Sequence, residues 1–377
     1  MASSVVNEFS CGFFKRLLGD SDNVFVSPHS VASALMLACL GAKGETAGQI
    51  ASALSLQGTD PAEWHSQYSG LCARLTDVAR DGGPVLEQAN KLFANLDIEI
   101  LDSFKSSAEK LYKSGIDALD FAGKSDESRI AINAWVEQQT KGKITDLLLP
   151  GSVSPATKLV LANAIYFNGK WDKPFKATST TDMDFHKSAN ETVTVKMMRE
   201  KLDLRFLCDD ALNADAVELG YQHNLMSMII IRPRDIDGLP KLQEALDSAI
   251  LSTLFNRLLV EMRKKVDLGL PKFNFAVSTD VSRLLPQLGI TDLFDSSKAD
   301  LSGMTSRAPL AISDVIHKAV IDVNEEGTEA AAATGMITRM MMMHTGEETF
   351  ICDRPFLFFI VEPNTRHMVF AGRFSSP

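Results

Sequence analysis

Six apolar runs of strand length lie between residues 158 and 362, and they constrain the fold more than any other feature of the sequence. They occupy residues 158–167, 193–198, 226–231, 266–275, 310–323 and 355–362. Most alternate or are apolar throughout and are bounded by Gly, Pro or Asn, as buried strands are. The first third is mainly helical in pattern, with segments ending at Gly19, running from Pro28 to Leu40 and from Thr46 to Leu54, and one strand-like run at 86–96. Helices first and strands later, without regular alternation, predict an α+β fold.

Composition and charge narrow the classes of partner. The 377 residues are 45% hydrophobic and no linker-like stretch divides them, so we expect one large domain over 1–377. A formal net charge of -10 opposes binding to nucleic acid or to anionic membranes. The most apolar stretch, Val31 to Leu40, is far shorter than the roughly 20 residues that span a bilayer.

The cysteines and the N-terminus bear on the compartment. The five cysteines are odd in number and form no CxxC pair, so neither a disulfide framework nor a zinc site is indicated. The N-terminal segment has a helical stripe of Val5, Phe9, Phe13 and Leu17 interrupted by charges, unlike a secretory signal. We therefore expect a cytoplasmic protein, one secreted without a visible signal peptide, or a mature secreted form whose signal has been removed.

Motifs of catalysis do not stand out. The sequence contains no GxSxG, HExxH, GxGxxG or GxxxxGK[ST] pattern, and its seven histidines are scattered, so no catalytic residue and no enzyme activity are predicted. Asp209, Asp210 and Asp215 lack the turn glycine and closing Glu of a calcium loop, and they predict a solvated acidic loop rather than a metal site. Asn190 begins an Asn-Glu-Thr sequon, a possible glycosylation site that a chance match also explains.

The segment at 324–350, NEEGTEAAAATGMITRMMMMHTGEETF, is the least usual part of the chain. No proline occurs between Gly327 and Pro355, so every backbone N–H there could join a sheet. With a period of two from Thr328, one face carries only small or uncharged side chains, while Glu329 and Arg339 fall on the other. The segment could therefore enter a packed sheet without burying a charge, although alanine and glycine do not hold it extended beforehand.

A frayed helical turn or flexible linker next to a soft methionine patch would also explain this segment. Four consecutive methionines cannot all face one core, however. An exposed extended peptide of this kind is what a protease cleft binds by strand addition.

At this point the sequence resembles the serpin family. NEEGTEAAAAT is similar to the hinge of inhibitory serpins, and DRPFLFFIVEPNT with AGRFSSP to the C-terminal strands of the family. NVFVSPHSVASAL, INAWVEQQTKGKI, LANAIYFNGKWDKPF, LPKFNF and LGITDLFDSSKADLSGM resemble further family blocks in the family's order. The FSSP ending is most similar to the ovalbumin-like, often intracellular, group.

The resemblance implies one α+β domain with three β-sheets, eight or nine helices and an exposed reactive-centre loop at about 327–350. It implies a suicide substrate: a serine protease attacks the loop, and the loop then inserts into the large sheet as an extra strand and traps the acyl-enzyme. The native fold would be metastable, with a lifetime set by kinetics.

The resemblance also assigns residues to three regions. The hinge comprises Glu325, Glu326, Gly327, Thr328, Ala330, Ala331, Ala332, Ala333 and Thr334. The shutter, beneath the large sheet, comprises Ser27, Ser30, Asn163 and His317, and the breach, at its top, contains Trp171. Gly327 would let the hinge bend, Thr328 would be the first side chain buried, and small alanines would ease insertion.

The family spacing of fourteen residues from Gly327 places the reactive bond between Met341 and Met342. Because the segment from Met341 to Pro355 is slightly longer than in similar proteins, Met340-Met341 and Met342-Met343 stay open, and Arg339 is the choice for a trypsin-like protease. Met at the reactive bond suits chymotrypsin-like, elastase-like or cathepsin G-like enzymes.

The expected partner is a target serine protease in a covalent complex with a monomer. No cofactor and no metal are expected. Glycosaminoglycan binding is not expected either, because only Met262 to Lys265 is locally basic. The alternatives are a non-inhibitory carrier or chaperone, an inhibitor of trypsin-like or cysteine proteases and, more distantly, a hydrolase.

Overall fold

The computed structural model describes residues 2–19, 23–56, 60–77, 84–306, 310–328 and 347–377. Within these ranges eight α-helices are present: α1 (Ala2–Leu17), α2 (Pro28–Gly41), α3 (Gly44–Ala53), α4 (Pro61–Asp77), α5 (Asp102–Tyr112), α6 (Ser125–Gln139), α7 (Leu239–Ala245) and α8 (Ser248–Val260). None of these helices is both long enough and apolar enough to cross a membrane.

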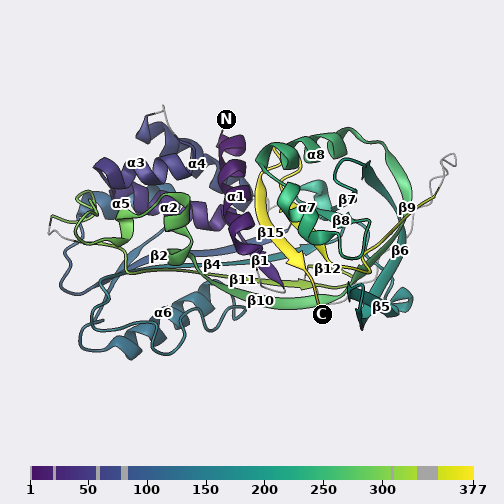
Figure 1. Cartoon of the computed structure of the whole chain (residues 1–377). Coiled ribbons are helices and arrows are strands. Elements are labelled where there is room, and N and C mark those ends of the chain that lie inside the picture. The colour runs from purple at the N-terminus through teal and green to yellow at the C-terminus, as the bar shows by residue number, and fades with distance from the viewer. Residues whose placement is uncertain (1, 20–22, 57–59, 78–83, 307–309, 329–346) are drawn as a thin grey trace.

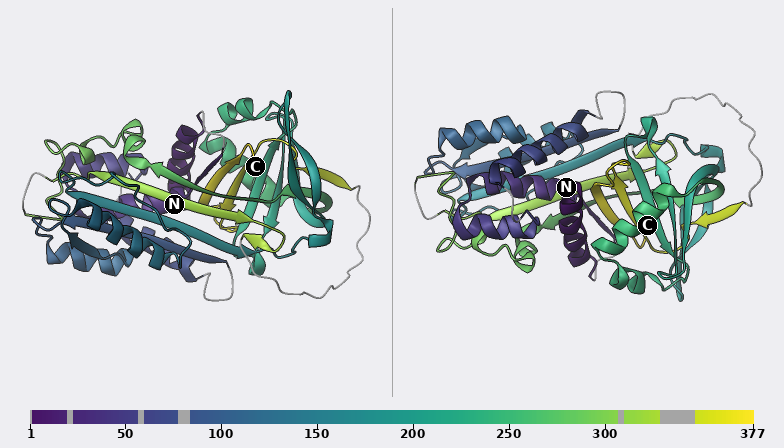
Figure 2. Two further views of the ribbon diagram at one scale, coloured as in Figure 1. Left: turned by 90° about the horizontal axis from the view of Figure 1, so that it is seen from below. Right: turned by 90° about the horizontal axis from the view of Figure 1, so that it is seen from above.

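A six-stranded sheet has the order β10-β11-β12-β4-β2-β3. Its strands are β2 (Val85–Asn95), β3 (Ile116–Leu119), β4 (Leu159–Lys170), β10 (Phe273–Asp280), β11 (Asp314–Val323) and β12 (Gly327–Thr328). Figure 1 shows α2 to α5 over one face of this sheet and α6 on the other, and Figure 2 shows that its long strands run along the length of the molecule. Because helices cover both faces, β4 is buried over nearly its whole length, as its continuous apolar pattern predicts.

A nine-stranded sheet contains the remaining strands. They are β1 (Val24–Val26), β5 (Thr181–Ser188), β6 (Glu191–Asp209), β7 (Ala214–Gly220), β8 (Ser227–Pro233), β9 (Arg263–Pro271), β13 (Glu348–Ile351), β14 (Phe356–Val361) and β15 (Met368–Phe374). The long strand β6 pairs with β5 up to Met197, with β9 from Met197 to Arg205 and with β7 from Arg205 onward, so it joins two smaller sheets into one. The expected α+β fold is confirmed, and the eight helices of the described residues agree with the expected eight or nine. Two of the three expected sheets are joined by β6 into the nine-stranded one.

Helix α2 shows how the sequence fixes the core. Its N-cap is Ser27, whose Oγ accepts the N–H of Ser30 at 3.1 Å, and Pro28 occupies the first turn. All but one of its residues are buried, because the helix is apolar on every side and lies between the strands and the other helices. One hydrophobic core spans both sheets, and a smaller one lies under α6.

The predicted strand at 266–275 is wrong in one respect. The chain forms two strands there, β9 and β10, which belong to different sheets and are separated at Lys272. The N–H of Lys272 bonds the carbonyl of Lys196, and Pro271 cannot donate a backbone hydrogen bond, so the ladder is interrupted where the chain crosses between sheets.

Candidate functional site: two anchors of one loop

The hinge begins inside the six-stranded sheet. Strands β11 and β4 pair directly, in parallel, from Asp314 with Val160 to Val320 with Tyr166. Beyond these residues the two strands are separated by β12, which pairs antiparallel with both of them. The side chain of Thr328 is therefore fully buried, whereas the residues that continue from it, 329–346, lie outside the described part of the chain.

Gly327 is required here by close packing. A Cβ at this position would lie 2.1 Å from the carbonyl oxygen of Gly169 and 2.6 Å from the Cα of Lys170. Both atoms belong to the backbone of β4, which cannot move aside like a flexible side chain. Only glycine fits where the chain turns into the sheet.

The breach holds this turn through backbone groups. The N–H of Trp171 donates to the carbonyl of Glu326 at 2.8 Å, and its indole N–H donates to the carbonyl of Asn324 at 3.0 Å. The ring of Trp171 is 1% exposed and stacks on that of Tyr221 with centroids 4.6 Å apart. The structure thus places Trp171 directly against the base of the hinge.

Glu325 is fixed from two directions. Its carboxylate pairs with Lys272 at 2.8 Å and accepts the hydroxyl of Thr180 at 2.8 Å, while its carbonyl accepts the N–H of Phe175 at 2.8 Å. Partial burial acts to raise the pKa of Glu325, but the bonds from Lys272 and Thr180 outweigh it and lower that pKa below its ordinary value.

The shutter lies where β11 and β4 are paired. His317 and Asn163 are register partners, and their side chains are hydrogen-bonded between Nδ1 and Oδ1. Nε2 of His317 accepts the N–H of Ser27 at 3.0 Å, and the amide of Asn163 donates to the hydroxyl of Ser30 at 2.7 Å. All four residues predicted for the shutter therefore come together, and the bond between His317 and Asn163 links the side chains of β11 and β4.

Three partners of the shutter have no signal in the sequence pattern. The amide of Gln88 donates to the hydroxyl of Ser30 at 3.1 Å, the amide of Asn163 also donates to Asn90, and the hydroxyl of Ser27 donates to the carbonyl of Val369 at 2.7 Å. Burial lowers the pKa of His317 to about 3, so this histidine is neutral. A neutral histidine with both nitrogens bonded is structural in this setting.

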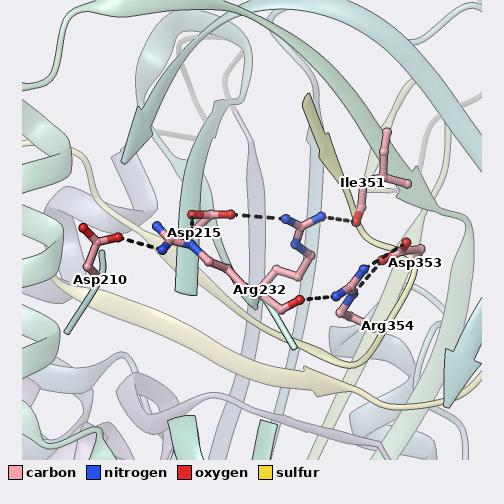
Figure 3. A network of polar contacts seen from close by, with 7 residues as sticks. Asp210, Asp215, Arg232, Ile351, Asp353 and Arg354 are labelled. Atoms are coloured by element: carbon pink, nitrogen blue, oxygen red, sulfur yellow. Dashed lines mark hydrogen bonds and ion pairs between the residues drawn. The ribbon is translucent and has the colours of Figure 1, made fainter. Parts of the chain in front are cut away.

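The second anchor of the loop is β13, at the edge of the nine-stranded sheet. It pairs in parallel with β9, from Glu348 with Val266 to Ile351 with Gly269. Figure 3 shows a chain of polar contacts behind it, in which Arg232 donates to the carbonyl of Ile351 at 2.7 Å. The guanidinium of Arg232 also lies 4.8 Å from the ring centre of Phe350.

Asp215 links this contact to the rest of the sheet. It accepts from Arg232 at 3.2 Å and from Arg234 at 2.9 Å, and Arg234 also pairs with Asp210 at 2.7 Å. The predicted solvated acidic loop is therefore wrong for two of its three members. Asp215 and Asp209 are buried, and Asp209 is paired with Arg257, because arginines on neighbouring elements neutralise them.

Several predicted positions lie outside the described residues. They are Ala330, Ala331, Ala332, Ala333, Thr334, Arg339, Met340, Met341, Met342 and Met343. Asn190 is described, and it lies exposed in the turn between β5 and β6.

The described chain thus leaves the six-stranded sheet at Thr328 and is described again from residue 347, just before β13 at the edge of the nine-stranded sheet. The family model described as serpin (serine protease inhibitor) matches residues 4–377, and the chain belongs to this family. The leukocyte elastase inhibitor of Bos taurus is 42% identical over 360 residues, which are 94% of this chain and 93% of that protein.

Two solved structures extend the comparison. Uncleaved ovalbumin has a TM-score of 0.89 at 30% identity, with 100% of each chain covered. Human thyroxine-binding globulin, solved with its hormone, has a TM-score of 0.90 at 29% identity, covering 100% of this chain and 98% of that one.

Proposed function

We propose that this chain is a suicide-substrate inhibitor of serine proteases of the elastase-like or chymotrypsin-like class. The observation that carries the proposal is β12: the strand that must grow during trapping has already begun between β11 and β4. The similarity to leukocyte elastase inhibitors supports an elastase-like target. The whole chain would act as one unit with its reactive-centre loop at about 327–350.

The chemistry belongs to the protease. Its serine oxygen attacks the carbonyl carbon of Met341, the bond from that carbon to the nitrogen of Met342 breaks, and the nitrogen leaves with a proton. The chain up to Met341 is then held to the protease as an ester, while β13, β14 and β15 keep the other fragment in the fold. Before water hydrolyses the ester, residues 328–341 add to the six-stranded sheet, a strand of roughly 45 Å at about 3.3 Å per residue. The protease would be carried along the sheet and its catalytic groups pulled apart.

Insertion of the loop would require the β11–β4 pairing to open. Seven register pairs, including His317 with Asn163, would have to part so that the new strand pairs with both neighbours. In this reaction the chain is the substrate and supplies no catalyst. It would act as a monomer without cofactor, in the cytoplasm or as a secreted protein.

The second candidate is a non-inhibitory carrier, which the likeness to thyroxine-binding globulin favours. An inhibitor of trypsin-like proteases, with Arg339 at the bond, or of cysteine proteases is the third. Incubation with pancreatic elastase, chymotrypsin, cathepsin G and trypsin, read on a denaturing gel, separates these candidates. A detergent-stable complex with one of the first three is expected, and mass spectrometry of the small fragment fixes the bond. Cleavage of the loop by every protease without a complex would reject the inhibitory function for this panel.

A further inference from the structure

The two sheets meet at a pair of aromatic residues beside the hinge. Trp171 directly follows β4, Tyr221 directly follows β7, and the two residues form an isolated antiparallel bridge. Their rings are stacked at 4.6 Å, and Phe167 packs edge-on against Tyr221 at 5.0 Å. The ring of Tyr221 is thus fixed on both sides, and it has little freedom to redirect its hydroxyl.

That hydroxyl is aimed at the first residue of the inserting strand. The Oη of Tyr221 lies 2.9 Å from the Oγ1 of Thr328, and both side chains are 0% exposed. The two hydroxyls are hydrogen-bond partners in a site closed to solvent. If Thr328 left the sheet, the hydroxyl of Tyr221 would lose this partner while its ring stayed clamped, and an unpaired buried hydroxyl is costly.

We infer that Tyr221 is a positioning residue for loop insertion, which latches Thr328 between β11 and β4 and so fixes the point from which the strand grows. This inference rests on the proposed inhibitory function. The first step of insertion is the least favourable one. It costs the conformational entropy of the first residues before new backbone hydrogen bonds can offset that cost. Because Thr328 is already in the sheet, insertion begins without this first step and can be completed before the acyl-enzyme is hydrolysed.

The latch differs in kind from the other contacts of the hinge. The bonds to Glu326 and Asn324 from Trp171 hold the turn before the strand and use backbone carbonyls that any sequence supplies. The bond from Tyr221, by contrast, joins its hydroxyl to the side chain of Thr328, so it depends on the identity of both residues.

Three variants test the latch: Tyr221→Phe, Thr328→Val and the double variant. Each single change leaves one hydroxyl buried without its partner, whereas the double change removes both and keeps the shape of the site. The matched control is Tyr112→Phe, which removes a partly buried tyrosine hydroxyl bonded to His65, between α5 and α4 and away from the hinge.

The first readout is amide hydrogen exchange of the 322–328 segment, measured by mass spectrometry without any protease present during labelling. Each single variant should exchange there about fivefold faster than the wild type, the factor for one net hydrogen bond, and the double variant should return close to the wild-type rate. Tyr112→Phe should leave this segment unchanged.

The second readout is the number of inhibitor molecules consumed per trapped pancreatic elastase. It should rise in both single variants and recover in the double variant. Unchanged exchange in both single variants, or losses that simply add in the double variant, would overturn the latch. If the wild type forms no complex with elastase, the inhibitory function fails for that protease, and the exchange arm still decides whether Tyr221 holds Thr328.

Discussion

His317 and Ser27 are joined by a hydrogen bond across 290 residues of sequence, with Nε2 of the ring accepting the backbone N–H at 3.0 Å. Since Nε2 accepts, the ring proton is on Nδ1 and is donated to Asn163. The N-terminus of α2 is therefore attached to the β11–β4 pair through one neutral tautomer. A proton on Nε2 would face an N–H donor and break the contact.

Replacing His317 by alanine should shorten the life of the active form. His317→Ala leaves the N–H of Ser27 and the carbonyl oxygen of Asn163 buried without this partner, at a cost of roughly 2–4 kcal/mol. Conversion to an inactive loop-inserted or polymeric form should be faster, as measured by residual protease inhibition after moderate heating. His186→Ala is the control, because its ring is bonded to the exposed Thr192, away from the shutter. An unaltered half-life of His317→Ala would contradict a structural role for the shutter.

Stability should fall on acidification below neutrality. Burial lowers the pKa of His317 and of His367 to about 3 and that of His65 to about 4, against roughly 6.5 in the unfolded chain. Between these values the unfolded state binds more protons, so the free energy of unfolding decreases as the pH falls from about 6.5 toward 4, by up to about 1.4 kcal/mol per pH unit for each histidine. Urea midpoints at pH 7.5 and 5.5 measure the slope, and His65→Gln should reduce it by one histidine's share. A midpoint independent of pH would be incompatible with these three pKa values.

A charge at Thr328 should turn the inhibitor into a substrate. Thr328→Arg would require a guanidinium in a site with no exposure, so the strand could not seat before the acyl-enzyme is hydrolysed. Denaturing gels should show cleaved chain in place of the covalent complex, with at least about tenfold more inhibitor consumed per protease. Thr349→Arg places the same charge at an exposed position on β13 and should trap normally. Normal trapping by Thr328→Arg would mean that residue 328 is not buried during inhibition.

Weakening the second anchor should let the uncut loop enter the sheet. Arg232→Gln removes the ion pair with Asp215 and weakens the contact with Ile351 that holds β13 from behind. An edge strand with one paired neighbour would then detach more readily, and inhibitory activity should decay faster at 37 °C without cleavage of the chain. Arg199→Gln, which breaks an ion pair with Asp267 on the same sheet, is the control. Equal decay rates for the two variants would show that Arg232 does not hold the anchor.

Mild oxidation should weaken the inhibition of apolar-pocket proteases. A sulfoxide at Met341 or Met342 would be polar in the specificity pocket. Met262 is 82% exposed and outside the loop, so it is oxidised under the same conditions and Met262→Leu serves as control. Met341→Leu with Met342→Leu should retain inhibition after oxidant. Full inhibition by wild type with sulfoxide confirmed at both residues would sink the assignment of the reactive bond.

The sequence pattern predicts a helix or strand correctly where the whole element is buried in the same way. The apolar run of β4 and the start of α2 at Pro28 are predicted correctly, because burial on all sides leaves a continuous apolar signal. The break between β9 and β10 at Lys272 is not predicted, because both strands are apolar although they belong to different sheets. What separates them is the position of β6 and β11 in three dimensions.

Some residues of the candidate site could be predicted from the sequence and others could not. Gly327 and Thr328 stand in a segment whose composition is unusual, and so the sequence draws attention to them. Tyr221 and Lys272 lie in ordinary surroundings along the chain, and they meet the hinge only because β7 and the start of β10 come to the top of the six-stranded sheet. The burial of Asp215 could not be predicted for the same reason, because its partners Arg232 and Arg234 lie on β8 and directly after it.

The order in which the nine-stranded sheet is assembled has a consequence for synthesis. β1, from the first thirty residues, pairs with β15, from the last ten, and β14 lies between β15 and β8. A chain still emerging from the ribosome lacks these two strands, and with them the phenylalanines that fill the centre of the core. The nine-stranded sheet therefore cannot close until β14 and β15 have been synthesised, and until then β1 lacks its pairing partner and part of the core stays exposed to water.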